Sequence, residues 1–85
     1  MKLNVKAFGL ALGIIWGAAA FIIGIWATMY DPAAVMVNFM GDFYLGYAPG
    51  FLGSIIGFLW GFVDAGIGGV IIAWLYNFFS DKFAS

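Results

Sequence analysis

Five residue types are missing from this 85-residue chain: cysteine, histidine, arginine, glutamate and glutamine. Without cysteine there is no disulfide, no thiolate nucleophile and no cysteine-ligated metal or iron–sulfur site. Without histidine the chain lacks the commonest general base and the commonest metal ligand. A net charge of −1 offers no basic patch for nucleic acid. We therefore expect no enzymatic activity, no metal site, no cofactor and no nucleic-acid partner.

Charged residues are scarce, at 8% of the chain, whereas 66% of the residues are hydrophobic. Soluble domains carry about 25% charged residues, and long apolar runs are typical of membrane spans. Two runs, at about 7–29 and 50–79, each exceed the ~20 residues that cross a bilayer. The first run is also too long for the apolar region of a cleaved signal peptide. The sequence predicts an all-α membrane protein: one membrane domain, residues 1–85, built as a hairpin of two transmembrane helices.

The few lysines predict the orientation of this hairpin. Lys2 and Lys6 precede the first span and Lys82 follows the second, whereas the connection holds Asp31 and Asp42 but no basic residue. Basic residues are retained on the cytoplasmic side of a membrane. We therefore expect both termini to be cytoplasmic and the connection to lie outside.

The connection, about residues 31–49, has the features of a short helix. Asp31 followed by Pro32 is typical of an N-cap before a proline at the first helical position. Residues 33–40 would form the helix, and Gly41 would end it. Because these residues are too apolar for a solvated element, we expect an interfacial helix in the outer connection.

Small residues recur at intervals of about four along one face of each expected span. In membrane helices this spacing lets two backbones approach closely, as in glycine zippers. We therefore interpret both faces as helix-packing surfaces. They comprise Gly9, Gly13, Gly17 and Gly24 in the first span, and Gly53, Gly57, Gly61, Ala65, Gly69 and Ala73 in the second.

Asp64 is the one charged residue between residues 50 and 79. A carboxylate at the centre of a bilayer costs ~2.5–3.5 kcal/mol on insertion scales, and such residues usually face a partner, water or an ion path. On a helical wheel Asp64 lies about 20° from Gly57, so we expect it on the small-residue face, shielded from lipid. Trp16 and Trp60 are candidate hydrogen-bond donors to it. Asp64 and Ser54 are the candidate residues of an intramembrane polar or ion path.

A resemblance adds to this interpretation. The segment Met1–Phe8, the pair Trp16-Gly17, and residues 51–64 and 71–79 resemble a family of small bacterial two-span membrane proteins, often labelled bacteriophage holins. The likeness covers nearly the whole chain and implies a helical hairpin in the bacterial inner membrane. The family brings no established activity. Many holins end in a strongly charged tail, whereas residues 81–85 here have balanced charge.

Two functions remain open from the residues, and a third from the resemblance. The first is a structural role, in which the protein self-associates or packs into a larger membrane complex through its small-residue faces. The second is a homo-oligomeric pore, or a proton or cation path, with Asp64 as the intramembrane carboxylate. The third, implied by the resemblance, is a holin-like lesion former. The lipid bilayer is a partner in each case.

Overall fold

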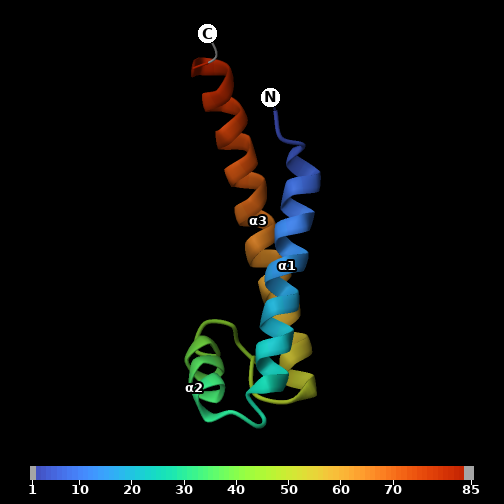
Figure 1. Cartoon of the computed structure of the whole chain (residues 1–85), viewed down its shortest axis with the longest axis vertical. Helices are drawn as coiled ribbons and strands as arrows, with labels where there is room; N and C mark the ends of the chain where they lie inside the picture. The colour runs from blue at the N-terminus through green and yellow to red at the C-terminus, as the bar shows by residue number, and fades with distance from the viewer. Residues whose placement is uncertain (1, 84–85) are drawn as a thin grey trace.

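The structure, a computed structural model, describes residues 2–83, and these contain three α-helices. They are α1 (Val5–Trp26), α2 (Asp31–Met40) and α3 (Phe51–Phe83). α1 and α3 are long and lie side by side, and the short α2 lies beside one end of them (Figure 1). The two ends of the chain lie at the opposite end of the molecule (Figure 1). The helices differ by a few residues from the expected runs of 7–29 and 50–79.

α1 and α3 have the length and composition of membrane spans. α1 has 22 residues and α3 has 33, and both are strongly apolar. Only 28% of the most apolar window of α1, and 17% of that of α3, is buried inside the protein. The core helix of a soluble protein would be mostly buried, so these exposed apolar surfaces indicate association with a membrane.

The backbones of α1 and α3 approach each other so closely that glycine is required between them. A Cβ atom added to Gly13 would lie 2.8 Å from the carbonyl oxygen of Phe62, and one added to Gly17 would lie 2.9 Å from that of Phe58. Real Cβ atoms essentially never come within 3.0 Å of another heavy atom. The glycines of α1 therefore make their close contacts with α3 of the same chain.

The order of these contacts shows that α1 and α3 run in opposite directions. A Cβ atom at Gly69 would lie 3.0 Å from the Cα of Gly9, near the start of α1. A Cβ atom at Gly61 would lie 3.1 Å from the Cα of Gly17, further along α1. Near the end of α1, Gly24 packs directly on Ser54 in the first turn of α3.

α2 begins and ends differently from the expectation. Its N-cap residue is Tyr30, with no side-chain cap, and Asp31 is the first helical residue, so the predicted cap is wrong by one residue. Gly41 has an ordinary right-handed φ of −62° and is not the left-handed terminator expected. Its lack of a side chain matters for space, because a Cβ atom there would lie 2.7 Å from the carbonyl oxygen of Tyr47.

The segment after α2 turns back toward α3 through two glycines with positive φ. Gly46 has φ +93° and Gly50 has φ +120°, values that other residues rarely adopt. Gly50 then donates a backbone hydrogen bond of 3.2 Å to the carbonyl of Gly24, which joins the start of α3 to the end of α1.

The two ends of the chain are held together by polar contacts. The side chain of Asn77 accepts a hydrogen bond from the amide of Leu3 at 2.7 Å and donates one to its carbonyl at 2.8 Å. Lys2 forms an exposed ion pair of 2.9 Å with Asp81. At the start of α1 the side chain of Asn4 accepts a hydrogen bond from the Ala7 amide and caps the helix.

Candidate functional site

Three polar side chains from three parts of the chain meet at the hydroxyl of Tyr44. Tyr44 lies in the connection between α2 and α3. Its hydroxyl donates a hydrogen bond of 2.5 Å to Asp64 Oδ2 on α3. It accepts one of 3.1 Å from the indole Nε1 of Trp16 on α1. We call Trp16, Tyr44 and Asp64 the polar cluster.

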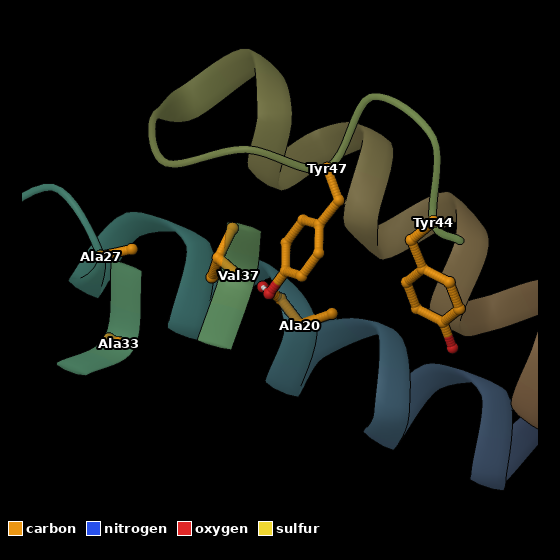
Figure 2. Packing of buried hydrophobic residues seen from close by; sticks show 6 residues of the cluster. All are labelled: Ala20, Ala27, Ala33, Val37, Tyr44 and Tyr47. Atoms are coloured by element: carbon orange, nitrogen blue, oxygen red, sulfur yellow. Dashed lines mark hydrogen bonds between the residues drawn. The ribbon is translucent and has the colours of Figure 1, made fainter. Parts of the chain in front are cut away.

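The connection is fixed in this position by its other aromatic contacts. Trp60 stacks on the Tyr44 ring, with centroids 5.9 Å apart and planes 14° apart, and its indole donates to the Leu45 carbonyl at 2.8 Å. The hydroxyl of Tyr47 donates to the carbonyl of Ala20 at 2.7 Å. Figure 2 shows the Tyr47 ring pointing toward Ala20 of α1, with Tyr44 beyond it. The side chains of Tyr44, Tyr47 and Trp60 therefore hold the connection, and with it the polar cluster, in place.

The small residues of α3 contact two different parts of the chain, the connection and α1. The ring of Tyr47 occupies the space where Gly57 would carry a side chain, and the backbone of Ala48 occupies the space beside Gly53. Gly61 and Gly69 lie instead against α1. The face that looked like one helix-packing stripe in the sequence thus has two occupants, α1 and the turn segment that precedes α3.

Tyr44 is buried but Asp64 is exposed. Tyr44 is only 6% exposed, whereas the Asp64 side chain is open to the surroundings of the chain. The expected shielding of Asp64 by a neighbouring helix is therefore absent within the single chain, and its hydrogen-bond partner comes from the connection. Next to it on this surface, Trp60 is 40% exposed and Leu45 is 67% exposed.

The polar cluster lies near the middle of the apolar helices. Trp16 is the twelfth of the 22 residues of α1. Asp64 is the fourteenth residue of α3, about 20 Å along the helix axis from Phe51. Tyr44 reaches this level because the connection folds back along the two helices and does not stay beyond their ends.

The electrostatics of the cluster favour a neutral phenol that donates a strong hydrogen bond. Burial, and then the hydrogen bond to Asp64, raise the pKa of Tyr44 above its ordinary value of 10.0, and the hydrogen bond from Trp16 acts in the opposite direction. Because the phenol keeps its proton, the Tyr44 hydroxyl is the donor and Asp64 Oδ2 is the acceptor in this hydrogen bond of 2.5 Å.

Ser54, the other polar candidate, lies apart from the cluster. It is fully buried, and its hydroxyl donates to the Gly50 carbonyl at 2.5 Å in the first turn of α3. Ten residues separate it from Asp64, about 15 Å along the helix. The structure does not bring the two residues together, and Ser54 serves the contact with Gly24 of α1.

Sequence reasoning identified Asp64 but not the residue that binds it. Trp16 and Trp60 were expected as donors to Asp64; Trp16 reaches it through Tyr44, and Trp60 binds the Leu45 carbonyl. The available signal was the group of aromatics with polar tips in the connection, too dense for a solvated loop. Within residues 2–83 no three acidic side chains gather as a candidate metal site.

No family model, curated protein or solved structure matches this chain. The likeness to small two-span proteins labelled as holins therefore stays a prediction.

Proposed function

We propose that this chain is a two-span hairpin of the bacterial inner membrane with a structural role, assembling with copies of itself or into a larger membrane complex. Both termini would face the cytoplasm, as the lysine distribution predicts. The small-residue faces would act first inside the chain, between α1, α3 and the connection. Assembly would use the neighbouring surface formed by Leu45, Trp60 and Asp64, which we call the Asp64 surface.

The exposure of Asp64 carries this proposal. In a membrane crossed by α1 and α3, its carboxyl group would lie near the middle of the hydrocarbon and face outward from the chain. Leaving an acid there costs ~2.5–3.5 kcal/mol on insertion scales. No lysine among residues 2–83 forms an ion pair with it, and Lys82 lies 18 residues away, about 27 Å along α3. A protein surface that covers Asp64 would remove most of this cost.

The path of the connection supports the same conclusion. Non-helical backbone at membrane depth is tolerated only where protein or a water-filled cavity surrounds it. The turn segment 41–50 packs on α1 and α3 through Tyr44 and Tyr47, but its other side is open, with Phe43 54% exposed and Leu45 67% exposed. A partner seated on the Asp64 surface would also cover this segment.

The test is the mass of the particle solubilised in mild detergent, measured by light scattering on a sizing column. We expect the parent protein to contain more than one chain, or a second protein. Asp64→Asn should keep the particle, because an amide both donates and accepts hydrogen bonds at similar volume. Asp64→Leu should reduce the assembled fraction, whereas the matched control Asp42→Leu, in the connection, should not. A parent particle of one chain would contradict the proposal.

A proton or cation path through Asp64 is the second candidate, favoured by one observation. The 2.5 Å hydrogen bond between Tyr44 and Asp64 joins two groups that can each carry a proton. Any such path would be narrow, because Ser54 and Asp64 are the clearly polar residues of α3 before Asn77.

A further inference from the structure

A second feature of the molecule lies between α1 and α3, from the level of Asp64 toward the ends of the chain. There the two helices border an open groove of about 570 Å³. Its lining is apolar except for one lysine. On the α1 side it is lined by Lys6, Gly9 and Leu10; on the α3 side by Phe62, Val63, Gly66, Ile67, Val70 and Ile71.

The dimensions of the groove match one leaflet of a bilayer. Along α3 it runs from Phe62 to Ile71, about 14 Å at 1.5 Å per residue. Half of a ~30 Å hydrocarbon core is about 15 Å. The Phe62 end lies at the level of Gly13, near the middle of α1. The groove therefore has the length and direction of a lipid chain that enters from the side of the termini.

The one basic residue that lines the groove, Lys6, lies at the end of the groove nearest the chain termini. Lys6 is one turn before Gly9, the residue that packs on Val70. Lys2, the other lysine nearby in sequence, is already paired with Asp81, whereas Lys6 has no ion-pair partner among residues 2–83. Trp74, one turn beyond Val70 and 60% exposed, adds the kind of amphipathic ring that is enriched at the headgroup level.

We infer that this groove binds an anionic phospholipid, with an acyl chain against Gly9 and Gly66 and the phosphate at the Lys6 ammonium group. The absence of side chains at these two glycines provides the depth for the chain. The charge of Lys6 selects an anionic over a zwitterionic headgroup. The inference requires that α1 and α3 span the membrane, but not that the Asp64 surface assembles.

The test is lipid retention by the full chain reconstituted in vesicles with equal phosphatidylglycerol and phosphatidylcholine. After mild extraction, native mass spectrometry counts each lipid bound. We expect about a fivefold preference for phosphatidylglycerol, since one lysine near an anionic surface contributes ~1 kcal/mol. Lys6→Gln should bring the ratio close to one, and the matched control Lys82→Gln should leave it unchanged.

A pair of glycine variants tests the location of the lipid. A side chain at Gly66 finds ordinary contact distances and would project into the groove, and one at Gly68 has nothing within 4 Å. Gly66→Leu should lower the retention of both lipids, and Gly68→Leu should not. The inference is overturned if Lys6→Gln keeps the parent ratio, or if Gly66→Leu changes the particle mass and leaves lipid retention intact. That second outcome would place a neighbouring protein in the groove.

Discussion

Tyr44 and Asp64 are 20 residues apart in the sequence and are joined by a hydrogen bond of 2.5 Å near the middle of the long helices. This contact brings the connection between α2 and α3 to the same level as Trp16 of α1. One hydroxyl thereby links both long helices to the connection. This hydroxyl thus adds to the contacts of Tyr47 and Trp60 that fix the position of the connection.

Tyr44→Phe should loosen the connection. The substitution removes only the hydroxyl, so the stacking on Trp60 remains while Trp16 and Asp64 both lose their partner. We expect a loss of about 1–2 kcal/mol in the free energy of unfolding, measured by steric trapping in bicelles. Tyr30→Phe is the matched control, because the Tyr30 ring is 44% exposed and stacks on Trp26 without a bound hydroxyl among residues 2–83. Equal losses in the two variants would contradict the role of the hydroxyl.

Large residues at two glycines of α3 should disturb the packing inside the chain. Gly57→Leu would collide with the ring of Tyr47, and Gly61→Leu with Gly17 of α1. The measurement is the formation of a disulfide between two cysteines introduced in α1 and α3. Because the chain has no native cysteine, no other disulfide can form.

The cysteine pair for this readout is Leu12→Cys with Gly69→Cys. A Cβ atom at Gly69 lies 3.2 Å from that of Leu12, close to the 3.5–4.5 Å of a disulfide. Oxidation should close the bridge in the otherwise unchanged chain and in the control Gly68→Leu, and should slow in the Gly57→Leu and Gly61→Leu variants. Full closure in all four would show that these glycines are not needed for the contact.

The long helices were predictable because composition alone determines them. A chain with 8% charged residues and two long apolar runs has few alternatives to two long apolar helices, and α1 and α3 lie where those runs lie. The spacing of the small residues also identified positions of close approach, such as Gly13 and Gly17. Periodicity could not show which segment fills each position, since a helix and an irregular connection both fit against glycine. Only the folded structure shows that the ring of Tyr47 fills the space beside Gly57.

The site was only half predictable for a similar reason. An isolated acid such as Asp64 is visible in the sequence because its cost in lipid is large and local. Its partner Tyr44 is one of several aromatics in an irregular segment, and its depth depends on the positive φ of Gly46 and Gly50. These turns have no periodic pattern. An interfacial location for the aromatics was therefore the simplest prediction, and the contacts of Tyr44 and Tyr47 reach further along α1.

The orientation in the membrane is testable with single cysteines. With both termini cytoplasmic, a membrane-impermeant maleimide added outside intact cells should label Asn38→Cys on α2, which is exposed. It should label Lys82→Cys only after the membrane is opened. The reverse pattern would invert the topology and would also move the Lys6 groove to the outer leaflet.

The last prediction separates packing from conduction at Asp64. If Asp64 handles protons or cations, Asp64→Asn should keep the particle but abolish flux, because an amide does not ionise near neutral pH. Flux is measured in proteoliposomes with a pH-sensitive dye inside and a potassium gradient as the driving force. Tyr44→Phe is a second variant, which keeps the carboxyl group and removes its 2.5 Å partner.

The pattern across the three proteins decides between the two roles. No flux in the parent would remove the ion path and leave the structural role. Equal flux in the parent and Asp64→Asn would indicate a pore that does not use the carboxyl group. Flux that is lost in Asp64→Asn and reduced in Tyr44→Phe, with particle mass unchanged in both, would assign proton transfer to the Tyr44–Asp64 pair. Our proposal of a structural protein predicts the first result, with Asp64 covered by its partner and closed to water.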